Sequence, residues 1–177
     1  MFSFMKKVVE FFEKTAKDHP LSVTLSISVL VAVHAALTRF GIIDNCWDPI
    51  ANMDEPPLDL YLAMLSVSAL QASFAVVIVV FGLSTQPEAF RDLRIRAGRA
   101  LIDNWMSISY SGFLSAACAL VASLLSLLGG KAQAPWAFEL SVLYCAHGII
   151  RLLWLLKDLI QVVRNDDIRA VQKMDER

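Results

Sequence analysis

Long apolar stretches alternate with short polar segments along this chain. A helix that crosses a bilayer needs about 20 predominantly apolar residues. Four stretches of that length run over residues 21–40, 60–83, 105–128 and 136–156. Within them, Arg39 and Arg151 are the only Lys or Arg residues. The pattern therefore predicts an all-α membrane protein with four transmembrane helices.

The basic residues outside these stretches indicate how the helices are oriented. The N-terminal segment, the second loop and the C-terminal tail hold thirteen Lys and Arg residues, whereas the first and third loops hold only Lys131. Short loops rich in Lys and Arg remain in the cytoplasm when a membrane protein inserts. We therefore expect both termini and the second loop to be cytoplasmic, as in a multi-pass protein of the bacterial inner membrane.

Composition agrees with this class and narrows the range of functions. Hydrophobic residues make up 56% of the chain, charged residues make up 19%, and the mean hydropathy is +0.55. An ordinary soluble domain has about 25% charged residues. The formal net charge of −1 argues against direct binding of nucleic acid. The chain carries no recognisable catalytic motif, so we expect no enzymatic activity, no cofactor and no metal.

The segments on either side of the four spans divide the chain into three parts. Residues 1–19 place apolar and charged side chains on opposite sides of a helix that ends before Pro20, which predicts an amphipathic helix at the membrane surface. A mobile lid or a partner-docking helix is the alternative. Residues 20–157 form the transmembrane domain. Residues 158–177 form a cytoplasmic tail whose weak apolar stripe is consistent with a short bundle in an oligomer.

The second loop is rich in arginine and is expected to be helical. Thr85 and Glu88 have the spacing of a capping box, so a helix should begin there and continue without a break into the third span. The arginines that could bind an anionic nucleotide or a soluble cytoplasmic partner are Arg91, Arg94, Arg96 and Arg99. The alternative is that they only determine topology and form ion pairs at the surface.

Polar side chains are expected near the middle of the membrane. Helix rise places Gln71, His147 and His34 close to the midplane, and Arg151 nearer the cytoplasmic side. Because polar groups in lipid are costly, these four residues are candidates for a gate or a hydrated path. The alternatives are hydrogen bonding within a four-helix bundle and, for Arg151, snorkelling to the interface.

The third span has one side of small and hydroxylated residues. That side consists of Ser107, Ser111, Ser115, Cys118, Ala122 and Ser126. A stripe of this kind can line a pore at the centre of an oligomer. It is equally typical of close helix packing, because small residues let helix backbones approach one another.

The first outer loop is acidic. It holds Asp44, Asp48, Asp54, Glu55 and Asp59. Repeated around a symmetry axis, these carboxylates would concentrate cations at the mouth of a pore. A solvated loop is the alternative, and the irregular spacing is unlike that of a metal site.

Two hypotheses of different classes follow. The first is a homo-oligomeric channel whose cytoplasmic helices respond to a ligand or partner. The second is a membrane-anchored sensor or scaffold that recruits a soluble partner without conducting ions. Quinone-dependent enzymes that re-oxidise disulfide catalysts share the length and the four spans, but they need paired outer cysteines, and here only Cys46 lies in an outer loop.

The short length, the orientation, the arginine-rich helix over 91–99 and the lack of an enzyme motif together resemble a known group of proteins. These are the small four-pass membrane components of bacterial anti-phage defence systems of the Hailong and Kiwa type. The resemblance covers the whole chain and rests on architecture. It implies a homo-oligomer, with a tetramer favoured, that depolarises the infected cell or recruits a partner at the envelope.

Overall fold

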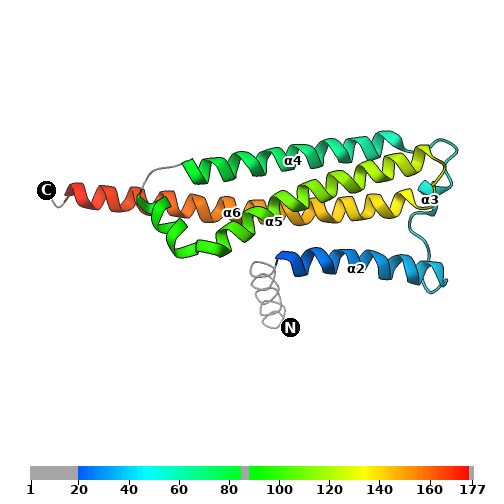
Figure 1. Ribbon diagram of the computed structural model, residues 1–177, viewed down its shortest axis with the longest axis horizontal. Helices are drawn as coiled ribbons and strands as arrows, with labels where there is room; N and C mark the ends of the chain where they lie inside the picture. Colours follow the sequence, from blue (N-terminus) through cyan, green and yellow to red (C-terminus); the bar gives the residue numbers. More distant parts are fainter. Residues whose placement is uncertain (1–19, 85–87, 176–177) are drawn as a thin grey trace.

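The computed structural model describes residues 20–84 and 88–175, and the described residues are helical apart from their loops. The amphipathic helix predicted over residues 1–19 lies outside the described residues. The helices are α2 (Pro20–Arg39), α3 (Asp48–Ala51), α4 (Leu58–Ser84), α5 (Glu88–Leu127) and α6 (Ala134–Asp175) (Figure 1). α3 is a single helical turn inside the acidic loop.

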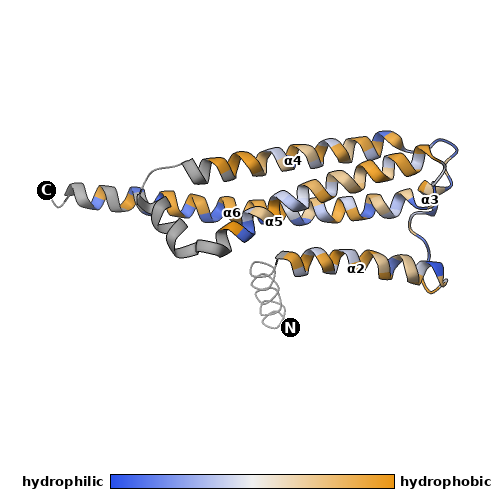
Figure 2. Ribbon diagram, in the orientation of Figure 1, coloured by the Kyte–Doolittle hydropathy of each residue, from blue (hydrophilic) through white to orange (hydrophobic). Residues whose placement is uncertain are grey.

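Four of these helices are long and apolar enough to cross a membrane, which confirms the prediction. Their apolar ranges are Leu21–Arg39, Leu58–Ile78, Ile102–Leu127 and Ala134–Asn165. Apolar residues dominate α2 and α4 along most of their length (Figure 2). α5 is one helix from Glu88 through the third span, and Thr85 of the predicted capping box lies outside the described residues. α6 continues beyond the fourth span to Asp175.

Three of the long helices form the core, and the fourth lies beside it. α5 packs along both α4 and α6, and α2 contacts chiefly α6 (Figure 1). Only 6% of the apolar window of α2 is buried, against 28%, 39% and 33% for α4, α5 and α6. The structure is therefore a three-helix bundle with a peripheral helix, in place of the four-helix bundle considered from the sequence.

The connection between α5 and α6 is a tight turn that makes the two helices antiparallel. Gly129 adopts a φ of 85°, a left-handed conformation that glycine adopts at little steric cost. The amide of Gly130 then donates to the carbonyl of Leu125 at 2.7 Å, which satisfies a carbonyl at the end of α5. We call the end of the bundle that holds this turn and α3 the loop end, and the opposite end the terminus end.

Two apolar clusters lie in the bundle, one near each end. The loop-end cluster consists of Tyr61, Ala122, Ala134 and Phe138. The terminus-end cluster consists of Ala75, Trp105, Ile108, Leu155 and Leu159. Most of the buried polar side chains lie between these clusters along the helices.

Candidate functional site

The first polar layer inside the bundle consists of three serines, one from each core helix. The hydroxyl of Ser115 on α5 lies 2.6 Å from that of Ser68 on α4 and 3.1 Å from that of Ser141 on α6. Ser115 Oγ also donates to the backbone carbonyl of Ser141 at 2.7 Å, and Ser141 Oγ donates to the carbonyl of Ser115 at 2.8 Å. These reciprocal bonds set the register of α5 against α6. We call these three residues the serine layer.

The second layer is centred on the side-chain amide of Gln71, on α4. Gln71 is 5% exposed, and neither its Nε2 nor its Oε1 has a hydrogen-bond partner among the described residues. The amide fits here because α6 carries Gly148: a Cβ at that position would overlap Gln71 Nε2 and Ser111 Oγ. The missing side chain therefore lets polar groups of α4 and α5 reach the backbone of α6. We call Gln71, Ser111 and Gly148 the glutamine layer.

The third layer holds the most deeply buried charged side chain among the described residues. Arg151 on α6 is 1% exposed, and its Nη1 donates to Asn104 Oδ1 on α5 at 2.8 Å. His147 lies one helical turn away on α6, is 9% exposed, and has no hydrogen-bond partner for Nε2 within the described part of the chain. We call Arg151, Asn104 and His147 the arginine layer. Burial this deep rules out the snorkelling considered for Arg151.

The serine, glutamine and arginine layers follow one another in the same order on α5 and α6, except that His147 directly precedes Gly148 on α6. On α5 the order is Ser115, Ser111 and Asn104, which covers about 16 Å at 1.5 Å per residue. On α6 it is Ser141, Gly148 and Arg151, which covers about 15 Å. The two lengths agree because α5 and α6 run antiparallel, side by side. The layers therefore occupy about half of the hydrocarbon thickness of about 30 Å.

Burial of these groups is energetically unfavourable unless something satisfies them. An unpartnered amide or hydroxyl removed from water costs about 1–3 kcal/mol. The glutamine layer and the arginine layer include unpartnered atoms of Gln71 and His147, and Trp105 Nε1 nearby on α5 is also buried without a partner among the described residues. Chemically, these groups can hydrogen-bond water or a small hydrated ion.

His34 belongs to a different cluster, at the loop end. Its Nδ1 lies 2.9 Å from Glu139 Oε1, and Trp47 Nε1 donates to Glu139 Oε2 at 2.7 Å. Glu139 is eight residues from His147 on α6, about 12 Å along the axis. The structure thus separates His34 from Gln71, His147 and Arg151. Trp136 packs edge-on against His34, with ring centroids 5.1 Å apart.

The small side of α5 lies mostly inside the chain. Ser111, Ser115, Ala122 and Ser126 are buried, and Ser107 and Cys118 are half-buried. Their neighbours within the chain are α4 and α6, as the bonds of Ser115 show. Close packing therefore accounts for the stripe, and pore lining at the axis of an oligomer stays a prediction.

The acidic loop is exposed and is held by a basic residue from another loop. The side chains of Asp44, Asp48, Asp54, Glu55 and Asp59 are all exposed. Lys131, between α5 and α6, donates to the carbonyls of Met53 and Asp54 at 3.2 and 2.8 Å. This contact connects the acidic loop to the turn after α5.

The other ligand candidates are not placed by the structure. Arg91, Arg94, Arg96 and Arg99 lie on the first turns of α5, but their side chains lie outside the described part. Among the described residues, no group of His, Cys, Asp and Glu side chains could hold a metal ion.

Sequence reasoning missed several members of the three layers. Ser68 is one of three serines in the second span, Ser141 is the one serine of the fourth span, and Asn104 lies just before the predicted start of the third span. Their depth along the helices could have indicated Ser68 and Ser141, because both fall within a few residues of the midplane. Nothing in the sequence indicated that Asn104 would be the partner of Arg151.

Comparisons of the chain with protein-family models, with curated proteins and with solved structures found no match.

Proposed function

We propose that the protein is a homo-oligomeric membrane channel, closed in this conformation, that a cytoplasmic ligand or partner opens. The observation that carries the proposal is the presence of two buried polar groups in successive layers of one bundle: the charged Arg151 and the unpartnered amide of Gln71. Ionisable side chains inside a membrane are costly, and they mark ion or proton pathways in most proteins that contain them.

The geometry favours a path through each chain over a path along the axis of the oligomer. All three polar layers lie between α4, α5 and α6 of a single copy. In the proposed homo-oligomer, for which a tetramer is favoured by the resemblance in architecture, every copy would carry its own path. The exposed carboxylates of the outer loop support a preference for cations.

The two apolar clusters supply a physical basis for the closed state. The loop-end cluster around Phe138 lies on one side of the serine and glutamine layers, and the terminus-end cluster around Leu155 lies on the other side, level with the arginine layer. Apolar constrictions exclude water and thereby block ions. Displacement of α6 by a ligand or partner on its cytoplasmic extension would open both clusters, because both contain side chains of α6.

The test first replaces one apolar side chain in each cluster by a polar one, so that water can enter. It then removes one polar group from the proposed path. Phe138→Thr combined with Leu155→Thr should produce potassium or proton flux in proteoliposomes without any ligand. Adding Gln71→Met should lower that flux at least about tenfold, which corresponds to about 1.4 kcal/mol of barrier. The matched control for Phe138 is Phe113→Thr, because Phe113 is 60% exposed and faces away from the layers.

Gln71→Met separates a role in conduction from a role in structure. Replacing an unpartnered buried amide by an apolar side chain of similar size is neutral or stabilising. The variant should therefore keep or raise the thermal stability while it lowers flux. Unchanged flux after Gln71→Met would contradict the assignment of Gln71 to the path. Absence of flux in the protein with Phe138→Thr and Leu155→Thr would contradict the channel proposal.

A sensor or scaffold is the second candidate, and the length of α6 favours it. The helix extends to Asp175 and exposes Ile168 and Val171, which are 46% and 51% exposed, beyond the fourth span. A protruding helix of this kind is a suitable docking surface for a soluble protein. Absence of flux in every arm of the test above would favour this candidate.

Anti-phage defence is proposed from the resemblance in architecture. Phages should form fewer plaques on bacteria that carry the gene together with its chromosomal neighbours than on bacteria that carry the Gln71→Met variant in the same setting. Equal plaque counts on the two strains would contradict a role of the proposed channel in anti-phage defence.

A further inference from the structure

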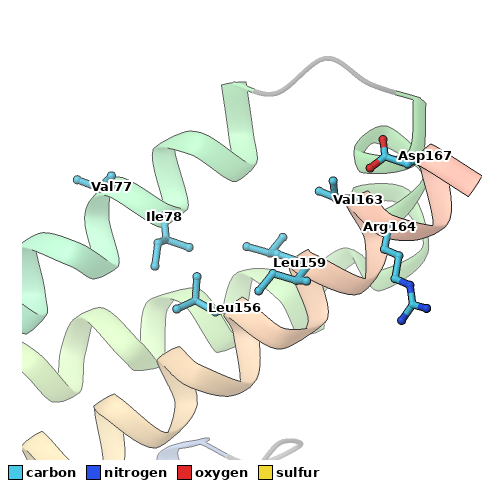
Figure 3. A pocket seen from close by; sticks show the side chains of 8 residues that line it. Val77, Ile78, Leu156, Leu159, Val163, Arg164 and Asp167 are labelled. Carbon is cyan, nitrogen blue, oxygen red and sulfur yellow. The ribbon is translucent and has the colours of Figure 1, made fainter.

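A polar cluster that the proposed channel does not use lies at the loop end. The groove at the opposite end, between α4 and the extension of α6, is lined mainly by apolar side chains of both helices, and lipid can cover it (Figure 3). At the loop end, by contrast, a thiol, an imidazole and a carboxylate come together from three segments of the chain. They belong to Cys46 in the acidic loop, His34 on α2 and Glu139 on α6.

The imidazole of His34 lies between the other two groups, with one ring nitrogen toward each. Its Nε2 is 3.9 Å from Cys46 Sγ, and its Nδ1 is 2.9 Å from Glu139 Oε1. Because an ionised carboxylate has no proton to donate, Nδ1 of the neutral ring carries the proton and Nε2 is the acceptor. The order of thiol, imidazole and carboxylate is that of a nucleophile, its base and the group that orients the base. The contact between nucleophile and base is often loose when no substrate is bound.

Two tryptophans hold the carboxylate and the imidazole in place. Trp47 Nε1 donates to Glu139 Oε2 at 2.7 Å, so both oxygens of the carboxylate have partners. The ring of Trp136 lies edge-on to that of His34, with centroids 5.1 Å apart. Contacts from α6 and from the acidic loop therefore fix the ring that faces the thiol.

The sulfur itself is accessible from solution. Cys46 is exposed and free, whereas Cys118 is half-buried and Cys145 is buried. Two exposed carboxylates, Asp44 and Asp48, lie within two residues of Cys46. Negative charge around a site raises the local concentration of cations. The surroundings of the sulfur thus favour the approach of a positively charged reagent.

We propose that Cys46 exchanges with disulfides from outside the chain and reacts best with those that carry positive charge. The thiol proton moves to His34 Nε2, and Cys46 Sγ attacks one sulfur of the disulfide R–S–S–R. A bond forms between Cys46 Sγ and that sulfur, the original S–S bond breaks, and the leaving sulfur takes the proton from His34. Cys46 is thereby oxidised to a mixed disulfide, and the other half of the reagent is reduced to R–SH. Glu139 is a positioning residue, because it acts through His34.

The expected orientation of the chain favours a disulfide over other electrophiles. The distribution of Lys and Arg predicts that the acidic loop faces away from the cytoplasm. Disulfides persist outside the cytosol, whereas the cytosol keeps thiols reduced. Exchange also needs no donor that stabilises an oxyanion, in contrast to acyl transfer. The inference is independent of the proposed channel, because none of its residues belongs to the three polar layers.

The experiment follows the reaction of the full-length protein in detergent with cystamine, a cationic disulfide, by intact-protein mass spectrometry. Cys46→Ser measures the background from Cys118 and Cys145. The matched control is Cys46→Ser with Asn52→Cys, because Asn52 is exposed in the same loop. A free thiol is only a few per cent ionised at pH 7, so Cys46 with its base should react about tenfold faster than the control thiol. Equal rates would overturn the proposal.

Removal of the base tests the role of His34. His34→Ala should lower the rate at Cys46 about tenfold, and free imidazole should restore part of the loss in this variant. Imidazole can replace a missing proton acceptor but does not repair a folding defect, and the Tm of each variant is measured in parallel. An unchanged rate in His34→Ala, or a loss that imidazole does not restore, would overturn the role of His34.

The role of Glu139 is tested in two backgrounds. Glu139→Gln should lower the rate about threefold in the otherwise native protein, because the imidazole loses its orienting carboxylate. The same substitution should have no effect on the rate in the His34→Ala protein, since its effect passes through the imidazole. A further loss of rate in the double variant would overturn the positioning role.

The charge of the reagent tests the preference for cations. Cystamine is compared with dithiodipropionate, which has the same spacer between sulfur and charge but carries carboxylates. The ratio of the two rates should fall about threefold when Asp44→Asn and Asp48→Asn are introduced together, because the attraction of cations is then lost. Differences in leaving group cancel in this comparison. An unchanged ratio would overturn the preference for positive charge.

Discussion

A glycine in the middle of α6 determines how closely the polar groups of the three core helices approach. Gly148 has no side chain, and the amide of Gln71 and the hydroxyl of Ser111 occupy the space that a Cβ would fill. The polar layers thus depend on one position where the backbone itself is the contact surface. Gly112 on α5 has a similar but looser contact with Ala72, whose Cβ would be 3.1 Å away from an added Cβ.

We predict that Gly148→Ala destabilises the bundle by about 1–3 kcal/mol, because the added methyl group overpacks a filled site. Thermal unfolding in detergent measures the change as a lower Tm. Ala146→Val is the matched control, since Ala146 is exposed on the same helix and should leave Tm almost unchanged. A Tm for Gly148→Ala equal to that of the control would contradict the close approach.

Ser115 is a second residue whose role changes once its neighbours are known. As part of a stripe on one helix, it is a candidate for the wall of a pore. With Ser68 and Ser141 within 3.1 Å, it is a junction between three helices. A large apolar substitution there would disturb packing as well as any path, so Gln71, whose amide is unpartnered, is the better probe of conduction.

At the scale of elements, α2 is attached to the core by a few polar contacts. Ser28 Oγ lies 2.6 Å from the hydroxyl of Tyr144, and His34 pairs with Glu139 nearer the loop end. Val31 is the one apolar side chain of α2 that is fully buried within the described residues. The attachment of α2 therefore depends on hydrogen bonds more than on packing, unlike that of α4 or α6 to α5.

We predict an energetic coupling of about 0.6–1 kcal/mol between His34 and Glu139. His34→Ala and Glu139→Ala are compared singly and together by the Tm and unfolding free energy in detergent. The combined variant should lose less stability than the sum of the two single variants, because the second substitution removes a partner that is already lost. Ser26→Ala with Glu139→Ala is the control, since Ser26 is exposed and bonds only within α2. If the stability losses are additive in both pairs, the His34–Glu139 contact does not hold α2 to α6.

The two longest helices extend beyond the bilayer at the terminus end. α5 has 40 residues and α6 has 42, whereas about 20 are enough to cross a membrane. In the proposed mechanism, a displacement of either extension would reach the polar layers along a continuous helix. This continuity gives a cytoplasmic ligand or partner a mechanical connection to the proposed path.

At the scale of the whole molecule, the distribution of basic residues predicts which side of the membrane each end faces. Labelling of the native cysteines can show which side of the membrane the loop end faces. Cys46 is exposed in the loop-end region, Cys118 is half-buried and Cys145 is buried. A membrane-impermeant maleimide added to cells with a permeabilised outer membrane should therefore label the protein at Cys46, and Cys46→Ser should abolish the labelling. Labelling that occurs only in inverted membrane vesicles would show the opposite orientation.

The number and extent of the spans were readable from the sequence because they depend on local properties. Apolar length and the lack of a helix breaker after residue 156 are both properties of a single stretch of sequence. The structure accordingly has α5 continuous from Glu88 and α6 continuous to Asp175. Helix rise alone predicted one level for Gln71 and His147, and the approach of Gln71 to Gly148, the neighbour of His147, agrees with this.

The tertiary structure decided which sides of the helices meet. Lipid is as apolar as the core of a bundle, so an apolar helix carries little sequence signal for its rotation. The partners of Ser115, His34 and Arg151 therefore emerged only when packing set the rotation and register of α2, α4, α5 and α6. Close approach at Gly148 and the reciprocal serine bonds fix the register of the core helices, and side-chain hydrogen bonds between helices join residues up to 116 positions apart. By itself the sequence determined four helices that are long and apolar enough to cross a membrane, and packing decided that the polar groups converge inside one chain.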